Sequence, residues 1–66
     1  MELLINGEPR TMPAGLTVAT LLLELGIRGE RVAIELNGEV IRKEQRAEKA
    51  LAPADRIEIV SFVGGG

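Results

Sequence analysis

The sequence contains no cysteine, histidine, tryptophan or tyrosine, and Phe62 is its only aromatic residue. Without Cys and His, the chain lacks the usual thiol nucleophile, the commonest general base near neutral pH and the commonest zinc ligands. No disulfide can staple the fold. A single aromatic residue cannot form a stacking platform for bases, and a net charge of -2 gives no basic footprint for nucleic acid. We therefore expect no autonomous catalysis, no bound cofactor or metal, and no nucleic-acid partner.

Long apolar runs are also missing. The longest covers only a few positions, whereas a helix needs about 20 apolar residues to cross a bilayer. Met1 is followed by an acidic residue rather than by a basic segment and an apolar stretch, so we expect no signal peptide and a cytoplasmic protein without a membrane partner. A chain of 66 residues with 45% hydrophobic content is suited to one small packed domain.

Two Asn-Gly pairs predict two β-hairpins, because this dipeptide readily adopts the positive φ angles of a tight turn. Asn6-Gly7 separates the apolar run 3–5 from a return strand over 8–12. Pro9 and Pro13 place that return strand at a sheet edge, since proline donates no ladder hydrogen bond. Asn37-Gly38 follows an alternating strand over 32–36 and precedes a short return at 40–41.

One helix is predicted between the two hairpins, over residues 18–25. Thr17 is its expected N-cap, and Gly26 supplies the left-handed residue at its end. Thr20 stands where a capping box has Glu or Gln, so we expect an incomplete box. The residues spaced to form one apolar face are Val18, Leu21, Leu22 and Leu25.

The remaining chain predicts a charged connection and a last strand. Residues 42–52 are rich in charge and alanine and suggest a helical turn anchored by Leu51, whereas 53–55 indicate a turn and 56–63 a strand. A hairpin, one helix and further strands give an α+β fold, a mixed sheet of four to five strands packed on one helix. This is the order of the β-grasp, or ubiquitin-like, roll, with first and last strands adjacent and parallel. We expect a domain over 1–63 and a flexible glycine tail over 64–66.

The internal carboxylates show no spacing typical of an acid/base pair or a metal cage. We interpret them as solvated surface groups, the ordinary place for such side chains. They are Glu24, Glu30, Glu35, Glu44, Glu48, Asp55 and Glu58. The internal glycines belong to turns and loops and form no phosphate-binding loop.

The glycine run Gly64-Gly65-Gly66 directly follows the last predicted strand, without a polar linker. Such a run can be a frayed end or an added linker. It can also enter a slot too narrow for any side chain and present a carboxylate there. Val60 and Phe62 have the strand parity opposite to that of the inward-facing isoleucines, which predicts an exposed docking surface beside the tail.

Three segments of the sequence together resemble the ThiS family of thiamine-biosynthesis sulfur carriers, over essentially the whole chain. They are Leu3–Glu8, Thr17-Val18 at the helix start, and Asp55–Gly66. Ubiquitin-like sulfur carriers end in Gly-Gly, which Gly65-Gly66 match, with Gly64 as an additional glycine.

The resemblance implies a protein cosubstrate rather than an enzyme. A ThiF-like adenylyltransferase would use ATP to activate the carboxylate of Gly66, and a cysteine desulfurase or persulfide relay would supply sulfur. The resulting thiocarboxylate would deliver sulfur to a ThiG-like thiazole synthase. Gly64 and Gly65 would enter the partner active sites, while Val60 and Phe62 would contribute to docking.

Three alternatives share these features. A sibling carrier could serve molybdopterin synthesis or tRNA thiolation with the same diglycine end. A ubiquitin-like modifier would join its activated terminus to lysines of other proteins. A β-grasp interaction domain could carry an inert tail. The sequence itself leaves all three open.

Overall fold

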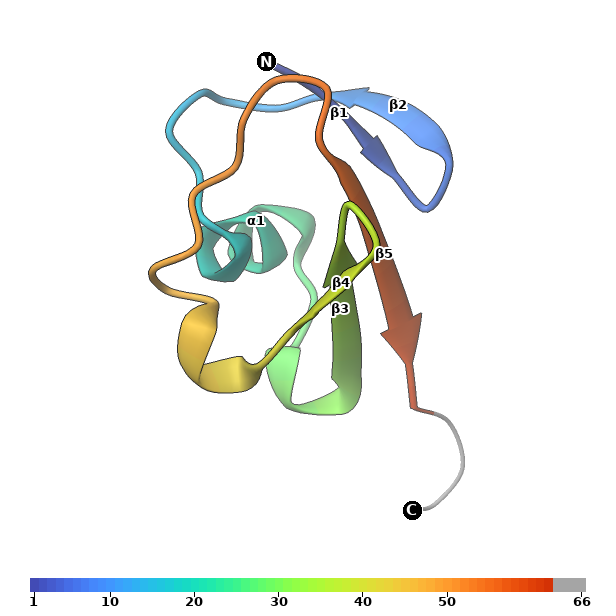
Figure 1. Ribbon diagram of the computed structural model, residues 1–66, viewed down its shortest axis with the longest axis vertical. Coiled ribbons are helices and arrows are strands. Elements are labelled where there is room, and N and C mark those ends of the chain that lie inside the picture. The colour runs from blue at the N-terminus through green and yellow to red at the C-terminus, as the bar shows by residue number, and fades with distance from the viewer. Residues whose placement is uncertain (63–66) are drawn as a thin grey trace.

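The computed structural model describes residues 1–62, so the glycine tail predicted over 64–66 lies outside the described residues, as does Val63. Five strands form one mixed sheet in the order β2-β1-β5-β3-β4, with β1 parallel to β5 and the other neighbours antiparallel (Figure 1). This sheet and the one α-helix within residues 1–62 confirm the β-grasp prediction. The elements are β1 (Glu2–Ile5), β2 (Glu8–Thr11), α1 (Val18–Leu25), β3 (Val32–Leu36), β4 (Glu39–Ile41) and β5 (Arg56–Ser61).

Both hairpin turns form where the Asn-Gly pairs predict them. Asn6 and Asn37 each have a φ of 51°, and the following glycines, Gly7 and Gly38, have φ of 82° and 86°. Positive φ at both central residues is the requirement of the tight turn that matches strand twist. Pro9 lies in β2, which is an edge strand as predicted.

The helix has the predicted bounds, but its N-terminal cap is more complete than predicted. The Thr17 side chain accepts a hydrogen bond from the Thr20 N–H at 3.2 Å, and the Thr20 hydroxyl accepts one from the Thr17 N–H at 2.7 Å. The expectation of an incomplete capping box was therefore wrong, because the short Thr hydroxyl reaches the backbone as a Glu or Gln would. Gly26 ends the helix in the left-handed conformation with φ 72°.

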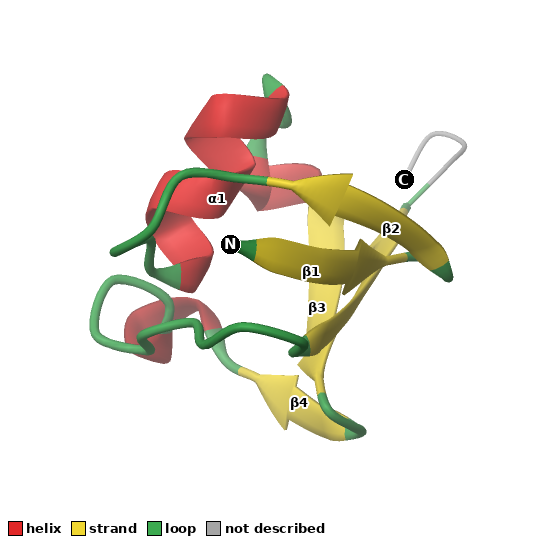
Figure 2. Cartoon of the chain, turned by 90° about the horizontal axis from the view of Figure 1, so that it is seen from above, coloured by secondary structure: helices red, strands yellow, loops and turns green. Residues whose placement is uncertain are grey.

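The hydrophobic core lies between α1 and the inner face of the sheet, which occupy separate layers (Figure 2). Its largest fully buried side chains come from β1, α1, β3 and β5, so each layer contributes. They are Leu3, Val18, Leu21, Ile34 and Ile57. Leu51 is buried too, as predicted for the anchor of the long connection.

One charged side chain of the long connection is buried, which the sequence did not predict. Arg46 is 7% exposed and follows a short 3-10 turn over Lys43–Gln45. Its guanidinium donates to the backbone carbonyls of Gly29 and Val32, both at 2.8 Å. A Cβ on Gly29 would lie 3.1 Å from the Arg46 Nη1, so the glycine permits this close approach. Arg46 thus joins the connection to the 3-10 turn Gly29–Arg31 that precedes β3.

Candidate functional site

The candidate site is the carboxyl end of β5, the strand that leads toward the glycine run. β5 begins between two partners: Ile57 is opposite Ile5 of β1 and Leu36 of β3. Pairing with β1 stops there, whereas pairing with β3 continues to Ser61. The first half of the strand is therefore central in the sheet, and its last residues are paired on the β3 side.

Side chains of β5 alternate between the two faces of the sheet. Ile57 has no exposed surface and Ile59 is half-buried against the core. On the opposite face, Val60 is 57% exposed and Phe62 is 59% exposed. The predicted parity is therefore confirmed, and both apolar side chains lie free on the outer face. Their predicted role in docking stays a prediction.

The backbone of Phe62 is still attached to the sheet although β5 ends one residue earlier. Its N–H donates to the carbonyl of Arg31 at 2.9 Å, in the turn that Arg46 holds. The strand predicted over 56–63 thus ends at Ser61, but the chain stays against β3 through one further hydrogen bond.

The outer face near this end also carries an acidic pair and a further exposed valine. Glu58 of β5 lies directly opposite Glu35 of β3, and Glu35 lies opposite Val40 of β4. Val40 is 67% exposed, and the sequence analysis did not single it out. Like charges opposite each other on neighbouring strands repel, so a basic group of a partner would be favoured here.

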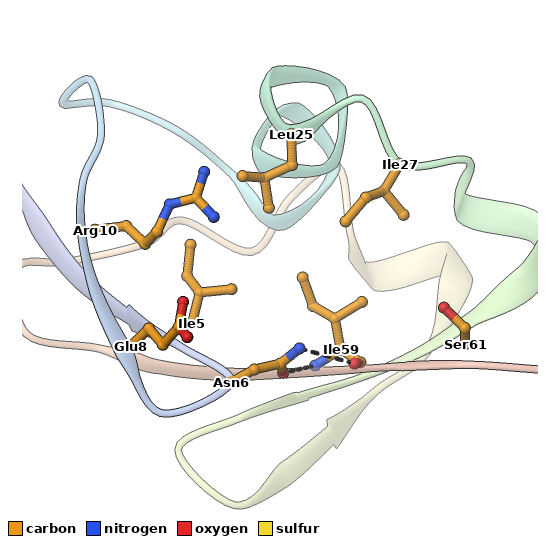
Figure 3. Close-up of a pocket in the computed structure, with 8 residues that line it drawn as sticks. All are labelled: Ile5, Asn6, Glu8, Arg10, Leu25, Ile27, Ile59 and Ser61. Atoms are coloured by element: carbon orange, nitrogen blue, oxygen red, sulfur yellow. Dashed lines mark hydrogen bonds between the residues drawn. The ribbon is translucent and has the colours of Figure 1, made fainter.

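A groove opens on the other side of the same strand end, between the first hairpin and the end of α1 (Figure 3). Its apolar part comes from Ile5, Leu25, Ile27 and Ile59, and its polar part from Asn6, Glu8, Arg10 and Ser61. The Asn6 side chain reaches across to the backbone of Ile59 and forms two hydrogen bonds with it. In the sequence Asn6 is only a turn signal, and nothing near it predicts this contact.

Within residues 1–62, no group of three or more His, Cys, Asp or Glu side chains is placed to hold a metal ion. No helix in that part of the chain is both long and apolar enough to cross a membrane. Of the last three described residues, Val60 and Phe62 lie on the outer face, whereas Ser61 lines the groove. The structure exposes Val60 and Phe62 as predicted, whereas Gly64, Gly65 and Gly66 lie outside the described residues.

Comparison with known proteins assigns this arrangement to a family. The model of the ThiS family matches residues 3–66. The chain belongs to the ThiS family. The sulfur carrier protein ThiS of Bacillus subtilis is 44% identical over 50 residues, which cover 76% of each chain. The crystal structure of the thiamine biosynthesis protein ThiS from Geobacter metallireducens superimposes with a TM-score of 0.87, at 38% identity and complete coverage of both chains.

A longer relative shares the same stretch. A thiazole synthase of Paramagnetospirillum magneticum is 47% identical over all 66 residues, but the chain spans only 20% of that protein's length. The ThiS family is that of the sulfur carriers of thiamine biosynthesis, so the fold, the family and its pathway agree with the resemblance noted in the sequence.

Proposed function

We propose that this chain is a sulfur carrier for thiamine thiazole synthesis, a protein cosubstrate rather than an enzyme. Its working group would be the carboxylate of Gly66, first adenylated and then converted to a thiocarboxylate. The observation that carries the proposal is the family match through residue 66, which includes the glycines after β5. The proposal requires that Gly66 carries a free carboxylate in the cell.

The chemistry of a carboxylate explains why such a carrier needs enzymes. An α-carboxyl group has a pKa of about 3.5, so it is ionised at neutral pH and resists nucleophiles. Attack of the carboxylate on the α-phosphorus of ATP, with loss of pyrophosphate, makes an acyl adenylate. A persulfide sulfur then attacks the acyl carbon and AMP leaves. A thiol then attacks the donor's cysteine sulfur in this acyl disulfide and forms a new disulfide with it. The S–S bond breaks, and the transferred sulfur stays on Gly66 as the thiocarboxylate.

Each part of the strand end has a role in this proposal. Gly64 and Gly65 pass into the partner's active site, since three extended residues span roughly 10 Å and glycine adds no side chain. Val60 and Phe62 contribute apolar contacts to the partner from the outer face, where more than half of each side chain's surface is exposed. The sheet provides a rigid base, because β5 starts between two strands.

We assign three partners to the carrier: a ThiF-like adenylyltransferase that uses ATP, a cysteine desulfurase or persulfide relay, and a ThiG-like thiazole synthase. The thiazole synthase is supported by the Paramagnetospirillum protein of that name, which contains a stretch 47% identical to this chain. We propose that the carrier acts in the cytoplasm, together with the ATP-dependent enzyme that would activate it. The carrier itself binds no cofactor in this scheme, because ATP is the substrate of the adenylating enzyme.

Mass spectrometry of the reconstituted reaction tests the proposal. The protein is incubated with a ThiF-like enzyme, ATP and a persulfide donor, and its C-terminal peptide is analysed. Exchange of oxygen for sulfur adds about 16 mass units, which oxidation of Met1 or Met12 also does, so the shift must map to the C-terminal peptide. A protein lacking Gly66 is the control. An unmodified C-terminal peptide would overturn the proposal, and conjugation to lysines of other proteins would favour a modifier instead.

A further inference from the structure

The side chain of Asn6 is bonded to the backbone of β5 near the point where that strand leaves the sheet. Its Oδ1 accepts a hydrogen bond from the Ile59 N–H at 2.7 Å, and its Nδ2 donates one to the Ile59 carbonyl at 3.2 Å (Figure 3). The two backbone groups of Ile59 fix the orientation of the amide, because an N–H needs the oxygen and a carbonyl needs the nitrogen.

These contacts extend the hydrogen-bond ladder between β1 and β5 past the end of β1 at Ile5. The Leu4 N–H donates to the Asp55 carbonyl, and the Asn6 N–H donates to the Ile57 carbonyl. In a parallel ladder the next donor, the Ile59 N–H, would go to the main-chain carbonyl of Asn6. The positive φ of Asn6 starts the hairpin turn there, and the side-chain oxygen takes the place of that carbonyl.

The end of β5 is consequently held by the β3 ladder on one side and by Asn6 alone on the other. Asn6 holds Ile59 on the β1 side, and the carbonyl of Arg31 accepts from the Phe62 N–H on the β3 side. Beyond Ile59 no residue of β1 faces the strand, since β1 ends at Ile5. Val60 and Ser61 pair only with β3, so loss of the Asn6 contacts would leave Ile59 as well bonded to the sheet along that single edge.

We propose that Asn6 is a positioning residue for the carrier's reaction: its side chain fixes the end of β5 and so sets the direction in which the glycine tail meets the adenylating enzyme. This inference rests on the proposed function. Because Asn6 holds the strand that bears Val60 and Phe62, it orients the docking side chains and the tail together. Such preorganisation reduces the ordering that the complex must otherwise provide.

The chain contains a matched control in its second Asn-Gly turn. Asn37 has the same φ of 51°, and its Oδ1 accepts from the Arg56 N–H at 2.9 Å. Its main-chain N–H donates to the Arg56 carbonyl at 2.7 Å. Asn37 therefore also holds the backbone of β5 through its side-chain oxygen, at the end remote from the tail, while its Nδ2 donates to the Asp55 side chain at 3.0 Å.

The test compares Asn6→Gly with Asn37→Gly, because glycine keeps the positive φ of each turn and removes only the side-chain contacts. Amide hydrogen exchange is followed by NMR at Ile59 and Phe62, and adenylation by ATP–pyrophosphate exchange with a ThiF-like enzyme. For Asn6→Gly we expect exchange at least about tenfold faster at both amides, since opening of the strand end needs less free energy. We also expect its kcat/KM for adenylation to fall roughly five- to tenfold.

Asn37→Gly should lower kcat/KM by less than about twofold, because the tail end keeps its own contacts. Asn6→Asp keeps the acceptor for the Ile59 N–H, so its kcat/KM for adenylation should lie between those of the wild type and Asn6→Gly. This variant replaces Asn6→Gly if the glycine variant does not fold. Equal kcat/KM for the Asn6 and Asn37 variants, with an adenylated wild type, would overturn the inference alone. A wild-type protein that is not adenylated would instead contradict the proposed function, whatever the exchange rates.

Discussion

At its start β5 runs between β1 and β3, whereas at its end it has β3 on one side and a single asparagine on the other. Ile57 at the start is fully buried, while Val60 and Phe62 at the end expose more than half of their surface. One strand therefore combines a buried region that stabilises the fold with an exposed region that contributes little to its stability. The difference supports the proposal that the exposed end makes contacts with other molecules.

The largest expected effect on stability comes from a substitution at the buried start of β5. Ile57→Ala removes three carbons from a fully buried position and should lower the free energy of unfolding by about 3 kcal/mol. Urea denaturation measures this loss. A change below about 1 kcal/mol would show that the core reorganises around β5 and that its start is not the anchored region.

Replacement of the buried Arg46 should lower the free energy of unfolding by a smaller but measurable amount. Arg46→Met keeps the bulk of the side chain and leaves the carbonyls of Gly29 and Val32 without their donors. We expect a loss of about 2 kcal/mol in the free energy of unfolding. Arg42→Met is the control at an exposed site and should stay within about 0.5 kcal/mol of wild type. Similar losses in both variants would contradict the role given to Arg46.

The exposed end should respond in the opposite way, with little change in stability and a large change in binding. Phe62→Ala should alter the free energy of unfolding by less than about 0.5 kcal/mol and weaken binding to the adenylating enzyme about tenfold. Titration calorimetry measures the affinity. Leu23→Ala, at an α1 position that is 76% exposed, is the control and should bind normally. Equal affinity of the two variants for the adenylating enzyme would show that Phe62 does not belong to the docking surface.

The smallest effect on stability is expected for the tail. Gly65→Ala should leave the thermal midpoint unchanged, because it lies beyond the strand, but should slow adenylation strongly since a Cβ enters the partner's slot. Differential scanning fluorimetry and ATP–pyrophosphate exchange measure the two quantities. Adenylation at the wild-type rate would show that the slot tolerates a side chain.

Much of the fold could be predicted because the deciding signals are local. The Asn-Gly pairs specify both turns, the 3.6-residue spacing specifies α1, and strand parity places Val60 and Phe62 outward. Arg46 could not be predicted, because its burial depends on two carbonyls 14 and 17 residues earlier in the chain. The contact of Asn6 with Ile59 spans 53 residues. The Asn-Gly dipeptide therefore predicts the turn but not the bond between the Asn6 side chain and β5.

The mass of the C-terminal peptide, taken from this protein in its native cell, shows directly whether Gly66 carries sulfur. We expect a peptide ending at Gly66 in which one oxygen of the terminal carboxylate is replaced by sulfur. In cells without the adenylating enzyme, the same peptide should carry only the carboxylate. A C-terminal peptide that never carries sulfur, or a chain in which Gly66 is followed by further residues and is never released, would contradict it.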